Sequence, residues 1–112
     1  MPHEPDLPLR PPVFHILLAL SRGERHGLGI AEEAEAASEG AVRLGPGTLY
    51  RTLDELRAQG LVAPTPPPSG DADPRRKHYR ITSAGRALLA AEVGRLERLL
   101  DIARTRVAGE TA

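Results

Sequence analysis

The stretch LGPGTLYRTL, residues 44–53, decides the fold because it marks both the start and the orientation of one helix. Apolar residues recur here every three or four positions, on one face of an α-helix: Leu49, Leu53 and Leu56. Gly45 suits an N-cap and Pro46 the first helical position, where an N–H has no partner to lose. The pattern predicts a helix over residues 46–59 that ends at Gly60.

The start of this helix carries residues that suit contact with an outside group. Glycine is a poor helix residue, yet Gly47 stands in the first turn, where it leaves room for a close approach. A helix N-terminus binds phosphate readily, and the hydroxyls of Thr48 and Tyr50 can donate to it. Arg51 lies opposite the leucines and can reach a guanine edge. The alternative interpretation is a tight turn with Tyr50 in the core and Arg51 as a solvated charge.

Basic residues are concentrated around this helix, although the net charge is zero. Residues 41–86 carry 8 Lys/Arg and 4 Asp/Glu, a net of +4, whereas residues 1–40 carry 3 and 7, a net of −4. Such a distribution is compatible with nucleic-acid binding. Asp54 and Glu55 oppose it, because they would repel a phosphate backbone. We therefore expect only the first turn and a half of the helix to enter a groove.

Composition excludes several classes of protein. The 112 residues suit one domain, and the absence of cysteine excludes disulfides, cysteine zinc sites and thiol catalysis. The longest apolar run, ILLAL, is too short to span a bilayer, and the acidic, proline-rich start is no signal peptide. The four histidines show no ligand spacing, and no catalytic triad or phosphate-binding loop stands out. We expect a cytoplasmic protein that is not an enzyme and needs no cofactor, metal or membrane.

The order of helix and strand signals predicts the fold. Helices are expected at residues 11–20, 26–38, 46–59 and 83–107. Strands are expected at residues 41–44, 61–65 and 77–82, with Ser83 as cap of the last helix. The order is that of a winged helix-turn-helix, a mainly α fold with a small β-hairpin as the wing. Its predicted parts are a flexible arm at 1–10, a DNA-binding domain at 11–82 with a wing loop at about 64–76, a C-terminal helix at 83–107 and a flexible tail at 108–112.

The last helix shows a heptad pattern. Its apolar residues are spaced 4, 3, 4, 3 and 4: Leu89, Val93, Leu96, Leu100, Ala103 and Val107. Leu99 and Ile102 form a second row, and about 24 residues give a helix of about 36 Å, longer than the small domain can cover. We therefore expect a homodimer whose interface contains these heptad residues and Leu99. The alternative is that the helix packs only on its own domain.

The second wing strand begins with consecutive basic residues, Arg75, Arg76 and Lys77. A basic wing beside a glycine-opened helix suits a clamp on a DNA backbone, which positions a protein without reading sequence. The alternative is a solvated hairpin end.

Three strings together resemble the PadR family of bacterial transcriptional regulators: ILLALSRGERHGLGIAEEAE, LGPGTLYRTLDELRAQGLV and RKHYRITSAGRALLAAE. The resemblance covers about residues 13–95. It implies a winged-helix domain with a C-terminal dimerisation helix, and repression as a homodimer on a palindromic operator. It places Thr48, Tyr50 and Arg51 toward DNA and His26 near the backbone. The predicted DNA-binding residues are His26, Gly47, Thr48, Tyr50, Arg51, Arg75, Arg76 and Lys77.

Two other functions stay open at this point. The acidic second helix and the apolar last helix could make the domain a protein–protein interaction module. The chain could also be a ligand-responsive repressor with a small-molecule effector site at the dimer interface, although its aromatic content of 3% offers little to a flat ligand. The double-stranded DNA partner is the leading expectation.

Overall fold

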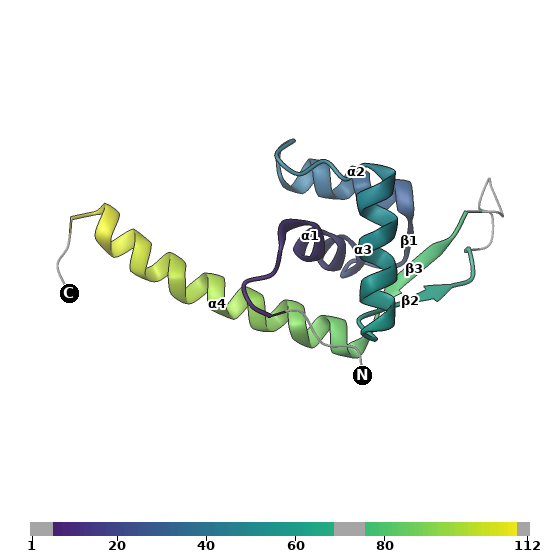
Figure 1. The fold of residues 1–112 in the computed structure, drawn as a ribbon. Coiled ribbons are helices and arrows are strands. Elements are labelled where there is room, and N and C mark those ends of the chain that lie inside the picture. Colours follow the sequence, from purple (N-terminus) through teal and green to yellow (C-terminus); the bar gives the residue numbers. More distant parts are fainter. Residues whose placement is uncertain (1–5, 69–75, 110–112) are drawn as a thin grey trace.

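Three helices of the computed structural model pack around one aliphatic core, and a fourth leads away from it (Figure 1). The structure describes residues 6–68 and 76–109. The helices are α1 (Pro11–Leu20), α2 (Gly27–Ala37), α3 (Pro46–Ala58) and α4 (Ser83–Val107). The strands are β1 (Arg25–His26), β2 (Val62–Thr65) and β3 (His78–Ile81). The predicted class, a mainly α winged helix-turn-helix with a small hairpin, is confirmed.

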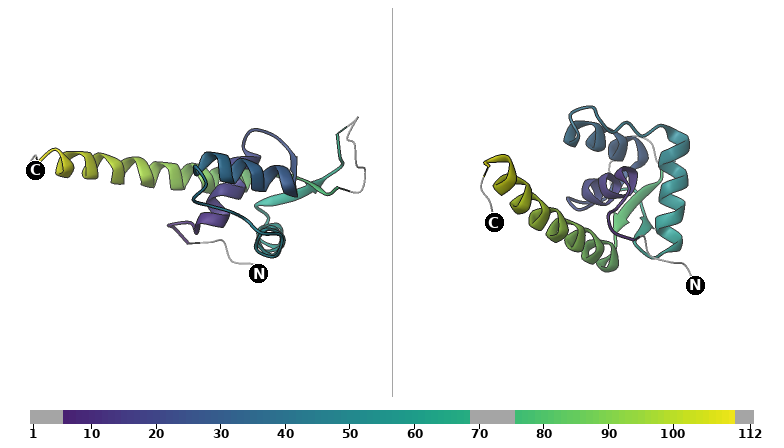
Figure 2. Two further views of the ribbon diagram at one scale, coloured as in Figure 1. Left: turned by 90° about the horizontal axis from the view of Figure 1, so that it is seen from above. Right: turned by 60° about the vertical axis from the view of Figure 1, so that its left-hand side comes forward.

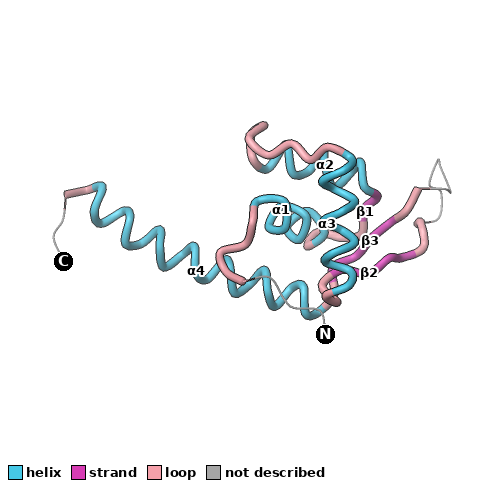
Figure 3. Tube along the Cα trace, viewed as in Figure 1, coloured by secondary structure: helices cyan, strands magenta, loops and turns pink. Residues whose placement is uncertain are grey.

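The three strands form one antiparallel sheet in the order β1-β3-β2 (Figure 3). Arg25 pairs with Tyr79 in β1 and β3, and Val62 pairs with Ile81 across the wing. The predicted strand at residues 41–44 is wrong. This segment is a loop, because the left-handed Gly40 (φ 83°) turns the chain and the Val42 N–H donates to the Ser38 hydroxyl at 2.8 Å.

The leucine face of α3 is buried as its spacing predicts. Leu49, Leu53 and Leu56 have at most 3% of their surface exposed. They pack in one cluster with the apolar residues of α1, including Ile16 and Leu17. Burying an aliphatic side chain of this size contributes about 1.5–3 kcal/mol, so these contacts fix how α3 is rotated. The opposite side of α3 is thereby directed outward.

The start of α4 is joined tightly to the wing. Thr82, and not the predicted Ser83, caps the helix: its hydroxyl accepts from the Gly85 N–H at 3.0 Å and donates to the Gly60 carbonyl at 2.7 Å. A β-carbon at Gly85 would overlap the carbonyl oxygen of Leu61. Glycine is therefore required there for the helix to approach the backbone that precedes β2.

The second half of α4 projects away from the domain, on the side opposite the wing (Figure 2). Its last buried residue is Glu92. Large apolar side chains beyond it are 38–88% exposed: Val93, Leu96, Leu99, Leu100, Ile102 and Val107. Across residues 6–68 and 76–109, no helix combines the length and apolar character that crossing a membrane requires.

The segment before α1 is attached to α4. Leu9 is buried, and its N–H donates to the Glu92 carboxylate at 2.8 Å. Hydrogen bonds from Arg95 first, and from Leu9, hold the pKa of Glu92 below its ordinary value. Arg10 forms an ion pair with Glu55 at 3.1 Å. The end of the predicted arm is therefore attached to α4 at Leu9, while its residues 1–5 lie outside the described part of the chain.

Candidate nucleic-acid interface

The start of α3 is open to an outside group. Gly45 is the N-cap and Pro46 the first helical residue, as predicted. A β-carbon at Gly45 or Gly47 would meet no atom within 4 Å, and neither residue has a left-handed backbone. Neither internal packing nor backbone geometry therefore explains why these two residues are glycines. The remaining explanation is that they leave space for a group outside the chain to approach the helix start.

The predicted contact residues of α3 lie on its outer side and flank. Arg51 is exposed, and Tyr50 is 43% exposed, so the interpretation that places Tyr50 in the core is wrong. Thr48 is half-buried, and its carbonyl accepts a hydrogen bond from the Thr52 hydroxyl at 2.7 Å. The described residues contain no carboxylate within ion-pair distance of Arg51. Its guanidinium is thus available at the surface.

Tyr50 lies against the first residue of α2. A β-carbon on Gly27 would overlap the Tyr50 hydroxyl and the ring carbon that bears it. Sequence reasoning missed Gly27, because a glycine at the start of a helix gives no sign of the residue that approaches it. The string HGLGI contains two glycines, and only the first carries this close contact.

His26 caps α2 through one ring nitrogen and leaves the other facing outward. Nδ1 accepts from the Gly29 N–H at 3.1 Å, so in a neutral imidazole the proton is on Nε2. The Arg76 guanidinium lies 3.2 Å from this Nε2. The His26 Nε2–H and the Arg76 guanidinium are then both hydrogen-bond donors, so neither can accept a hydrogen bond from the other. The geometry leaves two neighbouring donors without a mutual hydrogen bond, where an acceptor from outside could take both.

These residues surround one hollow of about 140 Å³. We call it the α2–α3 hollow, and it is lined by His26, Gly27, Leu28, Tyr50, Arg76 and Lys77. Four of the eight predicted DNA-binding residues therefore meet there, from β1, α3 and the base of the wing. Gly47, Thr48 and Arg51 lie on α3 outside it, and Arg75 lies outside the described residues. The hollow also receives the positive end of the α2 dipole, since α2 begins at Gly27.

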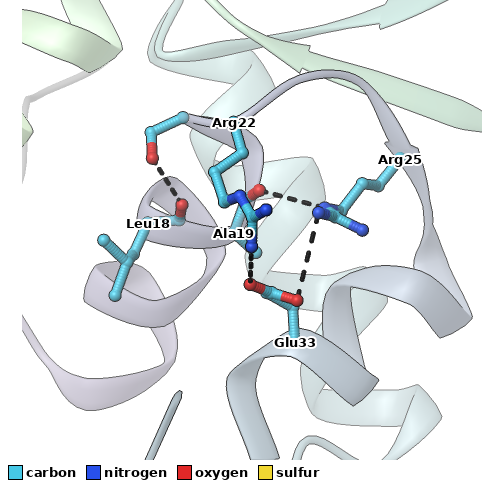
Figure 4. Close-up of polar contacts among 6 residues, drawn as sticks. Leu18, Ala19, Arg22, Arg25 and Glu33 are labelled. Carbon is cyan, nitrogen blue, oxygen red and sulfur yellow. Dashed lines mark hydrogen bonds and ion pairs between the residues drawn. The ribbon is translucent and has the colours of Figure 1, made fainter. Parts of the chain in front are cut away.

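Arg25 holds the start of α2 in place (Figure 4). Its Nε donates to the Ala19 carbonyl at the end of α1 at 3.2 Å, and its NH2 lies 3.9 Å from Glu33 of α2. Arg22 forms a second ion pair with Glu33 at 3.3 Å. Glu33 is therefore half-buried between two arginines. This arrangement positions His26, which follows Arg25.

His78 lies beside His26, although 51 residues separate them in the sequence. Their rings meet edge-on with centroids 5.5 Å apart. His78 is buried in β3, so its ring packs against His26 from the sheet. In the described ranges no three His, Asp or Glu side chains group as a metal site would need.

Residues 16–91 match the Transcriptional regulator PadR-like family. The chain belongs to this family. The predicted resemblance is thereby confirmed, and the family consists of DNA-binding transcription regulators, not of enzymes. The matched range includes the whole of α3 with its open start.

Individual relatives agree with this assignment. The transcriptional regulator Rv3488 of Mycobacterium tuberculosis is 40% identical over 87 residues, which are 77% of this chain and 76% of that protein. A 37.1 kDa protein in transposon TN4556 of Streptomyces fradiae is 38% identical over 84 residues; the match is 75% of this chain but only 22% of the longer protein. A PadR family regulator from Clostridium difficile has the same fold, with a TM-score of 0.71, 19% identity and coverage of 86% and 97% of the two chains.

Proposed function

We propose that this PadR-like chain is a sequence-specific repressor that binds a palindromic operator as a homodimer. The observation that carries the proposal is the α2–α3 hollow, where His26, Tyr50 and Arg76 converge from three different elements. In this arrangement the first turn of α3 lies in the major groove, and the hollow receives a phosphate of the adjoining backbone.

The chemistry of the hollow suits a phosphate. Phosphate oxygens only accept hydrogen bonds, and the side chains of His26, Tyr50, Arg76 and Lys77 can all donate. Hydrogen bonds from charged donors to phosphate are roughly twice as strong as those between neutral groups. The beginning of α2 adds the positive end of its dipole. Contacts of this kind set the position and orientation of a protein on duplex DNA.

Base reading is assigned to Arg51. Its side chain is exposed on the outer side of α3, beyond the glycine-lined start of the helix. A guanidinium can donate two parallel hydrogen bonds to the edge of guanine, the commonest specific contact in the major groove. Arg51 thus supplies sequence preference, whereas the hollow supplies affinity for the backbone.

The projecting half of α4 supports the homodimer. Leu96 and Leu100, which have heptad spacing, are 38% and 47% exposed, and Leu99 of the second row is 51% exposed. A monomer rarely leaves so continuous an apolar row in water. A second copy would cover the row and place two α3 helices on the same duplex, with half-sites about one helical turn apart.

Binding to DNA from upstream of the chain's own gene tests the proposal. Fluorescence anisotropy would compare that duplex with a shuffled one of equal length over a range of salt concentrations. We expect tighter binding to the upstream duplex and a steep loss of affinity with salt. Equal affinity for both duplexes would contradict sequence specificity. Absence of binding at low salt, together with a co-purifying protein partner, would instead favour the interaction module.

A further inference from the structure

A second and larger hollow lies between the end of α3 and the wing. It measures about 380 Å³, and we call it the wing groove. Residues that line it include Arg57, Thr65, Arg76, Lys77 and Tyr79. Arg76 and Lys77 also line the α2–α3 hollow, so the two hollows adjoin along the base of the wing. The wing groove is therefore continuous with the surface to which we assign DNA binding.

The wing groove is strongly basic. Arg57 comes from the last turn of α3, while Arg76 and Lys77 come from the segment that enters β3. None of the described residues that line it is acidic, and in the described part of the chain no carboxylate pairs with Arg57 or Lys77. Three like charges around one opening repel each other, and an anion between them removes this repulsion.

The groups that act on Tyr79 of β3 identify the face of α3 that borders the wing. Burial first, and then the charges of Tyr50 and Asp54, raise the pKa of the Tyr79 hydroxyl, whereas the charge of Arg57 lowers it. Tyr50, Asp54 and Arg57 are spaced four and three residues apart, so they form one stripe that faces β3. Asp54 is not among the lining residues. The stripe thus connects the α2–α3 hollow, at Tyr50, with the wing groove, at Arg57.

We infer that the wing groove binds a second backbone phosphate of the DNA, with Arg57 as a contact residue. The inference rests on the proposed function. With α3 in the major groove and the wing beside it, one DNA strand has to pass between them, and the basic groove lies along that route. Arg57 then extends the contact to the far end of α3, whereas the acidic pair at residues 54 and 55 had suggested that this end is lifted away.

The salt dependence of binding tests the role of Arg57. Arg57→Ala should weaken binding to every duplex by a similar factor and lower the slope of log K against log salt by about 1 per protomer. Base preference should not change. Arg98→Ala is the matched control, because it removes the same charge from an exposed position on α4, far from the wing. It should leave the slope unchanged.

A scan of neutral phosphates locates the contact. Single methylphosphonates are placed along the operator, and we expect one position at which wild-type protein loses affinity but Arg57→Ala protein loses none. The contrary result is that Arg57→Ala protein binds DNA as the Arg98→Ala control does, while Arg76→Ala still weakens binding. That result would overturn the assignment of a phosphate to the wing groove and leave the proposed function intact. The phosphate contact would also be overturned if Arg57→Ala lowered the melting temperature but left the salt slope unchanged. Arg57 would then act only through its interaction with the α3 dipole. Failure of the wild-type protein to bind any duplex would reject the proposed function itself.

Discussion

The hydroxyl of Tyr50 lies against the backbone of Gly27, in the space that a β-carbon would fill. The first residue of α2 and the second turn of α3 therefore meet with no side chain between them. This contact sets where the hydroxyl lies at the edge of the α2–α3 hollow, 43% of Tyr50 remaining exposed. Gly27 thus fixes the position of the Tyr50 hydroxyl.

Gly27→Ala should displace Tyr50 and weaken DNA binding. We expect a loss of about 1.5–3 kcal/mol in binding free energy, the value of one hydrogen bond to a charged group. The free energy of unfolding should change by less than about 1 kcal/mol, because the ring can rotate away and alanine favours helix. Gly29→Ala is the control, since its β-carbon would meet only ordinary contacts at 3.6 Å or more. Equal binding by both variants would contradict the role of Gly27.

Substitutions of Tyr50 and Arg51 should change DNA binding in different ways. Arg51→Ala should relax base preference at one position per half-site, by about 1–3 kcal/mol if it reads guanine. Tyr50→Phe should weaken all sites alike, because a phosphate contact carries no sequence information. A selection from randomised duplexes, carried out with each variant, separates the two effects. Unchanged operator affinity in both variants would show that α3 docks differently.

Leu96→Glu should break the dimer. Burying an unpaired carboxylate costs several kcal/mol, so the dissociation constant of the dimer should rise by at least about 100-fold. Sedimentation velocity measures this, with Arg98→Gln as a control of equal charge change. Because Leu96 is 38% exposed in the monomer and lies outside its core, the variant monomer should still fold, which circular dichroism checks. A Leu96→Glu protein that stays dimeric would place the interface elsewhere.

Glu92 should make stability depend on acid pH. Its pKa is lowered from 4.5 by Arg95 first and by the Leu9 N–H. A lowered folded-state pKa stabilises the fold fully above the ordinary value, and the contribution is lost as the pH falls through the folded pKa. Urea unfolding between pH 3 and 6 should therefore show a shallower acid limb for Glu92→Gln than for the wild type. The exposed Glu97→Gln control should retain the wild-type limb.

Sequence patterns predicted the parts of the fold that a single helix defines. The leucines of α3 gave its bounds, its buried face and the outward direction of Arg51, since a helical period is a local property. The heptad spacing of α4 likewise predicted the apolar row that is exposed in its second half. The open N-terminus of α3 was also predictable, because Gly45 and Pro46 have fixed preferences at a helix start.

Features that depend on distant residues were not predictable. The strand β1 has only two residues, Arg25 and His26, and exists because β3 pairs with it. The loop at residues 41–44 has apolar residues typical of a strand but pairs with none of the described strands. The buried position of Glu92 depends on the Leu9 N–H, 83 residues away. Such pairings leave no periodic signal in the chain.

NMR tests most directly whether the α2–α3 hollow binds DNA. The backbone amides of Gly27 and Leu28, at the α2–α3 hollow, would be followed while operator duplex is added to labelled protein. We predict that both signals shift saturably with the affinity measured by anisotropy, and that Arg76→Ala protein shows smaller shifts at equal saturation. Shifts confined to α4 or to the acidic face of α2, with both amides unmoved, would contradict it.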